Sequence, residues 1–369
     1  MDFGLSEEQL QLKHSAREFL AHECSTGFVR KVMAEPAGMP RELWKQMAKL
    51  GWTGLIVPEE FGGLGGSMLD MAVLLEECGY AALPGPLLFS CAVATHAIAQ
   101  GGDAEFKHKW LPSLADGSAI ATIAVVEEAA SISSADIHVM ARREGERWNL
   151  SGSKMFVPYA HVANVIIIAA RAESAEEVAL FAIETTARGV ETTMLSQLDL
   201  TRRVSLLKMD RAPATSLGAG SKLSERVLDI AAVAVGADSL GGSERALEMA
   251  VDYSKVREQF GKPIGSFQAL KHAAAEIVAD LEPARALLWY AAYAQDSLPD
   301  EASRAASMGK ARLSDIYSRA TDRAVLMHGG IGFTWEHDIH LWFKRARFNE
   351  SLYGSPVYHR ERLASLSKY

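Results

Sequence analysis

The stretch of sequence that decides the fold is Arg257-Glu258-Gln259-Phe260-Gly261-Lys262-Pro263-Ile264-Gly265-Ser266-Phe267-Gln268. It places a Phe-Gly pair three residues after an Arg, and a Gln eleven residues after the same Arg. Arg offers a rigid fork of hydrogen-bond donors, and a Gln amide both donates and accepts. Glycine lets the backbone turn where a Cβ would clash. Taken singly, these residues indicate a surface Arg, a core Phe and an ordinary turn, but the spaced block favours a binding segment.

A second block points the same way. It begins sixty residues after Gln268 and reads His328-Gly329-Gly330-Ile331-Gly332-Phe333-Thr334-Trp335-Glu336. The glycines at 329 and 330 allow a phosphate or an adenine to approach the backbone closely. Such a turn by itself more often marks only the end of a helix. Because it follows the first block, it becomes a candidate binding turn.

The two blocks together resemble the acyl-CoA dehydrogenase family, flavoenzymes that desaturate acyl-CoA thioesters. The first block is similar to the family's second signature, and the second lies where the family has its second flavin-binding turn. The resemblance implies FAD as cofactor, with contacts from Arg257, Phe260, Gln268, His328, Gly329, Gly330 and Phe156. It also implies that the Arg257 segment reaches the flavin of a neighbouring subunit, so we expect at least a dimer. The family often has a Gln where this chain has Leu326.

The order of the expected elements indicates an α+β protein of three domains. We expect an α-helical N-terminal domain at residues 1–117, a β domain at 118–214 and a C-terminal four-helix bundle at 221–369. Ser6 and Gln9 have the spacing of a capping box at the start of the first helix. Short β-type runs separated by glycines predict a small antiparallel sandwich or barrel, at residues 125–126, 148–150, 165–168 and 180–183. This order of helical, β and helical segments resembles the acyl-CoA dehydrogenase architecture.

The β region departs from the family pattern at the expected flavin edge. Residues 148–154 resemble the family's W-x-L-x-G-x-K, which is followed by an aromatic residue and then by a Thr that hydrogen-bonds the flavin ring. Here those places hold Phe156 and Pro158, and Pro has neither an N–H nor a hydroxyl. Arg202 either assists at this edge or forms a strand-end salt bridge. The family's Thr-Glu-Pro-x-x-Gly-Ser-Asp segment is reduced to Val126-Glu127-Glu128 through Ser134-Ala135-Asp136.

The position of the catalytic base departs further. Removing a proton α to a thioester carbonyl calls for a base in a dry pocket, and most family members use the Glu of a Tyr-Glu-Gly-Thr motif. This chain has Leu352-Tyr353-Gly354-Ser355 there, so Tyr353 occupies the Glu position. A phenol, with a pKa of about 10, is a poor base at neutral pH unless it is strongly perturbed.

Other positions compete with Tyr353 for this role. Some relatives carry the Glu on the first helix of the C-terminal domain, where this chain has Ala231. Asp238 lies about two helical turns further on, on nearly the same face, either as a displaced base or as a surface or interface acid. Glu350 is typical of a solvated helix residue. Tyr353 and Asp238 are therefore the two catalytic candidates.

Composition argues against several classes of function. The chain has 369 residues, a formal net charge of −8 and a pI of about 5.8, whereas nucleic-acid-binding proteins favour a basic patch. His337 and His340 belong to no HExxH motif, and no CxxC pair occurs, so we expect no metal site. No apolar run approaches the roughly 20 residues that span a bilayer, and the acidic N-terminus is unlike a secretion signal. We expect a cytoplasmic protein without nucleic-acid or membrane partners.

Three functional hypotheses remain open. In the first, the protein is an FAD-dependent acyl-CoA dehydrogenase, a homodimer or homotetramer that passes electrons to an electron-transfer flavoprotein. In the second, it is a non-catalytic subunit of an α₂β₂ heterotetramer whose paralogue carries the Glu and whose FAD site it completes. Family members of this kind act notably in steroid side-chain degradation. In the third, it is a flavin monooxygenase or a thioester-binding protein on the same fold.

Overall fold

The computed structural model describes residues 4–145, 147–173, 177–218 and 220–367. The chain divides into two compact units, each assembled from several segments. The first unit contains Met1–Lys31, Ala72–Leu83 and Ala232–Tyr369, and the second contains Val32–Met71 and Pro84–Ala231. This division follows contacts in space rather than order along the chain. The domain boundaries expected from the sequence, after residues 117 and 214, therefore remain a prediction.

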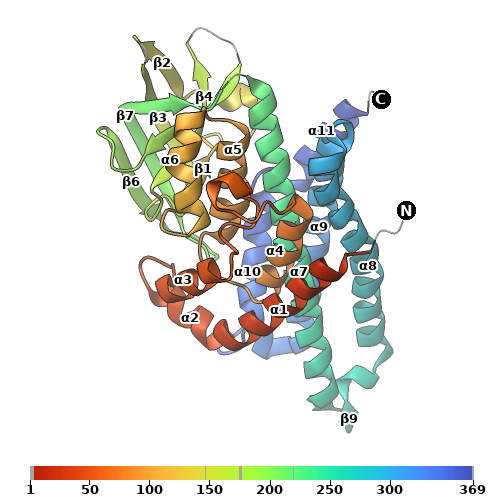
Figure 1. The fold of residues 1–369 in the computed structure, drawn as a ribbon. Coiled ribbons are helices and arrows are strands. Elements are labelled where there is room, and N and C mark those ends of the chain that lie inside the picture. The colour runs from red at the N-terminus through yellow and green to blue at the C-terminus, as the bar shows by residue number, and fades with distance from the viewer. Residues whose placement is uncertain (1–3, 146, 174–176, 219, 368–369) are drawn as a thin grey trace. The chain divides into compact units, whose positions relative to one another are not determined.

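A curled β-sheet is the main feature of the second unit (Figure 1). Among the described residues its strands are β1 (Ala121–Ala124), β2 (Met140–Glu144), β3 (Arg147–Pro158), β4 (Val165–Ala172), β5 (Val178–Glu184), β6 (Val190–Leu195) and β7 (Val204–Ser216). The pairings β4–β2, β2–β3, β3–β7, β7–β5 and β5–β4 close into a ring, to which β1 and β6 attach through β4 and β7. The prediction of a sandwich or barrel is therefore resolved in favour of a barrel.

Two details of the predicted sheet were wrong. The pairing is not purely antiparallel, because β1 and β2 both run parallel to β4; the long connections between these strands leave room for parallel pairing. The β run expected at residues 125–126 also falls outside a strand, since β1 ends at Ala124. Instead, the carbonyl of Val125 accepts from the Lys154 side chain, and the carbonyl of Val126 accepts from the Met155 N–H.

Short helices complete the second unit. Among the described residues they are α3 (Arg41–Lys49), the 3-10 helix η1 (Glu59–Phe61), the π-helix η2 (Leu88–Ala94), α5 (Thr95–Gln100), α6 (Ala104–Ala115) and the 3-10 helix η3 (Ser134–Asp136). The helix expected near residues 42–50 is thus confirmed, and the glycine-rich segment at 62–66 is a turn-rich loop, as expected. The π-helix packs against β1 and is wholly buried.

Long helices build the first unit (Figure 1). They are α1 (Glu7–Glu23), α8 (Gln268–Ser297), α9 (Pro299–His328), α10 (Ile339–Ser351) and α11 (Pro356–Leu366), while α2 (Thr26–Ala34), α4 (Met68–Tyr80) and α7 (Ser221–Val256) each cross the unit boundary. The expected capping box is confirmed, because the Ser6 hydroxyl accepts from the Gln9 N–H and the Gln9 amide accepts from the Ser6 N–H. No described helix has the length and apolar character needed to cross a bilayer.

The bundle in this unit is held together by close helix contacts. Helix α9 packs against α8, α10 and α11, and apolar side chains from α7, α9 and α10 share one core cluster. Helices α4 and α7 cross where both carry glycine. A Cβ on Gly241 would lie 1.8 Å from the Glu76 carbonyl oxygen, and one on Gly79 would lie 2.1 Å from the Asp238 carbonyl oxygen. The crossing therefore requires glycine at both positions.

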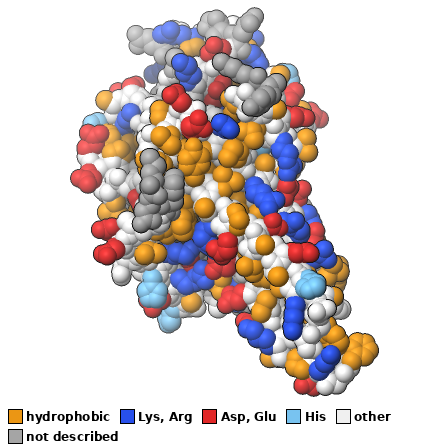
Figure 2. Space-filling model, turned by 90° about the vertical axis from the view of Figure 1, so that its right-hand side faces the viewer, with side chains coloured by type: hydrophobic (Ala, Val, Ile, Leu, Met, Phe, Trp, Pro, Cys, Tyr) orange, Lys and Arg blue, Asp and Glu red, His pale blue; other side chains and the backbone are white. Residues whose placement is uncertain are grey.

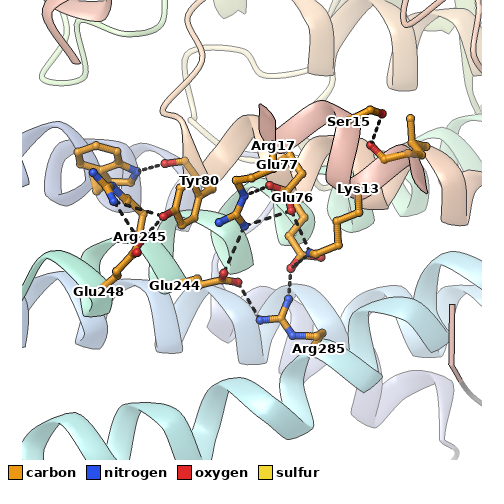
Figure 3. A network of polar contacts seen from close by, with 12 residues as sticks. Lys13, Ser15, Arg17, Glu76, Glu77, Tyr80, Glu244, Arg245, Glu248 and Arg285 are labelled. Carbon is orange, nitrogen blue, oxygen red and sulfur yellow. Dashed lines mark hydrogen bonds and ion pairs between the residues drawn. The ribbon is translucent and has the colours of Figure 1, made fainter. Parts of the chain in front are cut away.

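An ionic network joins α1, α4, α7 and α8 (Figure 3). Glu76 and Glu77 of α4 have fully buried side chains. Lys13 lies 2.7 Å from Glu76 and 3.0 Å from Glu77, Arg17 pairs with Glu77, and Arg285 pairs with Glu76. A third acid, Glu244 of α7, lies 3.2 Å from Arg17 and 2.9 Å from Arg285. Three carboxylates are thus balanced by three positively charged side chains.

Candidate functional site

The segment from Arg257 to Gln268 forms a short hairpin between α7 and α8. Its strands are β8 (Glu258–Gln259) and β9 (Lys262–Pro263), and the Ile264 N–H donates to the Arg257 carbonyl at 2.8 Å. The turn residues Phe260 and Gly261 both have positive φ, at 55° and 76°. Glycine adopts such a conformation readily, whereas Phe does so at a cost. The hairpin therefore holds Phe260 in an unusual conformation at its tip.

The hairpin presents its side chains outward. Phe260 is 91% exposed, and Arg257 and Gln268 are exposed as well. Figure 2 shows hydrophobic side chains beside Lys and Arg side chains at the lower end of the molecule, where Figure 1 places β9. Phe267 steadies the tip, with its ring centroid 6.0 Å from that of Phe260 and 4.6 Å from the Lys262 Nζ. An aromatic, anionic ligand would meet a matching surface here.

The glycine block forms the turn that ends α9. The 3-10 helix η5 (Gly329–Phe333) follows His328 directly, and Gly329 has φ of 64°. A Cβ built on Gly329 or Gly330 would meet no atom within 4 Å, whereas one on Gly332 would lie 2.7 Å from the Val325 carbonyl. Gly332 is therefore required by packing. Gly329 and Gly330 instead border open space, where a ligand could reach the backbone.

Tyr253 links the two blocks. Its carbonyl accepts from the Arg257 N–H at 2.8 Å, and its ring centroid lies 4.7 Å from that of His328. His328 is buried, its Nδ1 lies 2.7 Å from the Ala324 carbonyl, and its ring is 4.2 Å from that of His337. Burial lowers the pKa of His328. Tyr253 had no sequence motif to mark it, and cofactor contact by His328 stays a prediction.

The second unit holds its own group of sequence-predicted residues. Phe156 is half-exposed with φ of 53°, and the β3–β7 register shifts between Lys154 and Val157. A bulge of this kind re-aims a side chain, so Phe156 is directed by the backbone rather than by strand alternation. Two residues further on, the Pro158 carbonyl accepts from the Thr122 hydroxyl at 2.6 Å.

A buried ion pair anchors the loop before β2. Lys154 Nζ lies 2.7 Å from Glu127 Oε1, and the Glu127 carboxylate accepts from the N–H groups of His138 and Val139. Burial lowers the pKa of Lys154 to about 8. Burial would raise the pKa of Glu127, but hydrogen bonds from Lys154 and the backbone outweigh it and leave the pKa lowered. Glu127 thus ties the loop before β2 both to Lys154 of β3 and to the backbone at His138 and Val139.

Arg202 takes a packing position within the same unit. It is buried, its guanidinium carbon lies 5.3 Å from the Phe89 ring centroid, and its Nη1 donates to the Gly85 carbonyl at 3.4 Å. Its expected assistance at the flavin edge remains a prediction.

Tyr353 lies in the turn between α10 and α11. It is 3% exposed and has φ of 53°, which is costly for a residue with a side chain. Its carbonyl lies 2.9 Å from His359 Nε2. Burial lowers the pKa of His359 to about 3, so this ring is neutral at neutral pH. The residue at the expected base position is thus buried and held in a strained turn.

Asp238 is engaged in a buried polar group of the first unit. Arg345 Nη1 lies 3.3 Å from its Oδ1, and the Asn349 amide donates to its Oδ2 at 2.7 Å. Arg345 also donates to the Leu83 carbonyl at 2.8 Å. Because both carboxylate oxygens of Asp238 are occupied, its burial has a structural explanation that requires no catalytic role. Its assignment as a base stays a prediction, in second place to Tyr353.

Comparison with known proteins agrees with this arrangement. The profile "Acyl-CoA dehydrogenase, N-terminal domain" matches residues 6–118, and "Acyl-CoA dehydrogenase, C-terminal domain" matches residues 218–366. The chain belongs to the acyl-CoA dehydrogenase family. Among its relatives is Acyl-CoA dehydrogenase IpdE2 of Mycolicibacterium smegmatis, 34% identical over 363 residues that make up 98% of each chain.

Solved structures of the family match the whole fold. One is a variant of the Tcur3481-Tcur3483 steroid ACAD, with 30% identity, a TM-score of 0.91 and coverage of 98% of both chains. Another is the ChsE4-ChsE5 complex from Mycobacterium tuberculosis, with 26% identity, a TM-score of 0.93 and coverage of 100% of this chain and 99% of that one. The predicted family and fold are therefore confirmed.

Acyl-CoA dehydrogenases bind FAD, and the residues of this chain fit that cofactor. The first unit offers an exposed Arg and an exposed aromatic ring on the hairpin, and open backbone at Gly329 and Gly330. Guanidinium and N–H groups are suited to a pyrophosphate. No group of three or more His, Cys, Asp or Glu able to hold a metal ion occurs within the described part of the chain.

Proposed function

We propose that this protein is an FAD-dependent acyl-CoA dehydrogenase that introduces an α,β double bond into an acyl-CoA thioester and passes the electrons to an electron-transfer flavoprotein. The observation that carries the proposal is that the Arg257 hairpin and the open glycine turn lie on the same unit. Tyr253 contacts both, through its carbonyl to the Arg257 N–H and through its ring to His328, which precedes the glycines. Matches to both family domains support it.

Within this proposal the residues of the chain have distinct tasks. Arg257, Phe260 and Gln268 bind the cofactor, as do Gly329 and Gly330, while bound FAD supplies the hydride acceptor. Tyr353 is the group at the α-proton, either as the base or as a donor to the thioester carbonyl. Its burial suits the donor role, because a low-dielectric pocket strengthens a hydrogen bond, whereas the base role requires the charged phenolate that burial disfavours. Asp238 is the second candidate base.

A second function is favoured by one observation, the Tyr at the usual Glu position. In this alternative the protein is a non-catalytic subunit that completes the FAD site of a Glu-bearing paralogue in an α₂β₂ assembly. The similarity to chains of the ChsE4-ChsE5 complex and to the Tcur3481-Tcur3483 pair supports it. In either case the exposed hairpin suits a neighbouring subunit, so at least a dimer is part of the proposal.

The visible spectrum of the chain expressed alone separates the two functions. It is recorded without oxygen, before and after a panel of acyl-CoAs that includes short-chain, long-chain and steroid side-chain thioesters. A yellow protein that bleaches with one of them is a self-sufficient dehydrogenase. A colourless protein, or a yellow one that no thioester bleaches, contradicts that function and favours the partner subunit, which co-expression with a Glu-bearing paralogue then tests.

A further inference from the structure

Lys310 of α9 is completely enclosed within the first unit. Its Nζ lies 2.9 Å from the carbonyl oxygens of both Asn349 and Gly354, 3.2 Å from that of Glu350 and 3.0 Å from the Ser314 hydroxyl. Lysine is seldom fully buried without an acidic partner in contact. This ammonium group instead donates mainly to backbone carbonyls of residues 349–354. Lys310 therefore binds the main chain of a segment distant in sequence.

Those oxygens come from the end of α10 and the turn after it. The last carbonyls of a helix have no partner within the helix, and a cation there is favoured by the helix dipole. Lys310 satisfies the carbonyls of Asn349 and Glu350 and, with the same atom, that of Gly354. It therefore ties the end of α10 to the turn that contains Tyr353.

Tyr353 is the residue that this tie encloses. Its φ of 53° is costly, whereas the next residue, Gly354, adopts its φ of 102° readily. A costly conformation of this kind persists only where the surroundings over-determine it. Two side chains, one from α9 and one from α11, hold the backbone of this turn. His359 of α11 lies 2.9 Å from the Tyr353 carbonyl, and Lys310 of α9 lies 2.9 Å from the Gly354 carbonyl.

The acidic residues near Lys310 form their ion pairs with other residues. Glu350 and Asp315 attract the ammonium group, but their carboxylates pair with Arg347 and Arg360. On α11, the His359 ring is affected by both Lys310 and Arg362. Burial lowers the pKa of Lys310 to about 7. The protonated amine has three N–H groups for its four acceptors, and the neutral amine has two.

We propose that Lys310 is a positioning residue for the acyl-CoA reaction, holding the backbone on either side of Tyr353 so that the phenol meets the substrate in one orientation. This inference rests on the proposed function, because it needs Tyr353 to take part in the reaction. The requirement for accurate placement is severe, since a shift of roughly 1 Å in a reacting group costs up to about 10²-fold in rate.

The test compares Lys310→Met with Ser314→Ala in the full chain loaded with FAD. Methionine keeps the volume and removes the donors, whereas the Ser314 change removes one acceptor that lies outside the turn. Two quantities are measured: hydrogen–deuterium exchange of residues 349–359, and the rate of flavin bleaching as a function of acyl-CoA concentration.

We expect Lys310→Met to lose exchange protection in residues 349–359. At saturating acyl-CoA its flavin should bleach roughly 10-fold to 10²-fold more slowly, with little change in the acyl-CoA concentration that gives half of the maximal rate. Ser314→Ala should keep both properties. Unchanged protection in Lys310→Met would overturn the tie to the turn, and lost protection with a normal rate would overturn the positioning role. If the wild-type chain bleaches with no thioester, the proposed function fails, while the exchange comparison still decides whether Lys310 holds the turn.

A second measurement covers the case in which Lys310→Met does not fold. In the wild-type chain, exchange protection at residues 352–355, corrected for intrinsic chemistry, should rise between about pH 7 and about pH 9, because the closed site favours the neutral amine and opening the turn returns the amine to water. Protection of α3 in the second unit serves as the control and should change less. A flat profile at the turn would count against Lys310 as its support.

Discussion

Arg345 Nη1 lies 3.3 Å from Asp238 Oδ1, with both side chains almost wholly shielded from solvent. Removing one partner of a buried ion pair leaves the other charge unpaired, at a cost of about 3–5 kcal/mol. We expect Asp238→Ala to lower the free energy of unfolding by about this amount, as measured by urea titration. Asp252→Ala, which removes an exposed acid paired with Lys255 on the same helix, should change it little. A fall in turnover without loss of stability would instead support Asp238 as a base.

Arg257 is expected to be necessary for cofactor binding. Arg257→Ala removes a guanidinium that lies exposed beside the hairpin, so the fold should persist while the purified protein loses its flavin. The ratio of absorbance at visible and ultraviolet wavelengths measures the flavin content. Arg323→Ala gives a control that removes another Arg of the same unit. Normal flavin content in Arg257→Ala would refute the cofactor assignment.

Tyr353→Phe separates the phenol from the packing of its ring. Flavin content should remain normal, and turnover should fall by about 10²-fold or more, because a positioned acid–base group contributes at least that much. Tyr353→Glu restores the carboxylate usual in the family and should recover turnover relative to Tyr353→Phe. Unchanged turnover in Tyr353→Phe would remove the phenol from the mechanism.

Lys310 makes stability depend on pH in a direction that can be calculated. Burial lowers its pKa from 10.5 to about 7, so between these values the unfolded chain binds the extra proton. Stability should therefore rise with pH in that interval, by up to about 1.4 kcal/mol per pH unit. Urea titrations from about pH 7 to about pH 9 should show wild type gaining stability relative to Lys310→Met. A constant or shrinking difference would contradict this.

Glu77 should be essential to the docking of α1. Glu77→Gln leaves Arg17 and Lys13 with one acid fewer inside the network, and both are partly exposed. We expect a loss of between about 1 and about 3 kcal/mol, together with faster proteolysis within α1. Glu18→Gln removes an exposed acid of α1 that faces His14 and should behave like wild type. Equal cleavage rates in the two variants would count against the network.

Sequence motifs and hydrophobic periodicity were sufficient to predict the family, the helical character of the N- and C-terminal parts of the chain and the approximate position of the barrel. They failed where a residue is defined by partners distant in sequence. The tie between Lys310 and Gly354 spans 44 residues, and Lys154 meets Glu127 across 27. Neither separation has a periodic signature, and a lysine in a helical pattern is ordinarily read as exposed. The parallel pairing of β1 with β4 was missed for the same reason, since strand runs do not encode their partners.

The ionic network of Figure 3 also limits which substitutions this sequence can accept during evolution. Because Lys13, Arg17 and Arg285 balance Glu76, Glu77 and Glu244, any one neutral replacement leaves a net charge among closely packed helices. A tolerated change at one position must therefore be accompanied by an opposite change at another. These six positions should vary as a set among relatives. Transplanting α1 into another member should succeed only when the network residues of α4, α7 and α8 come with it.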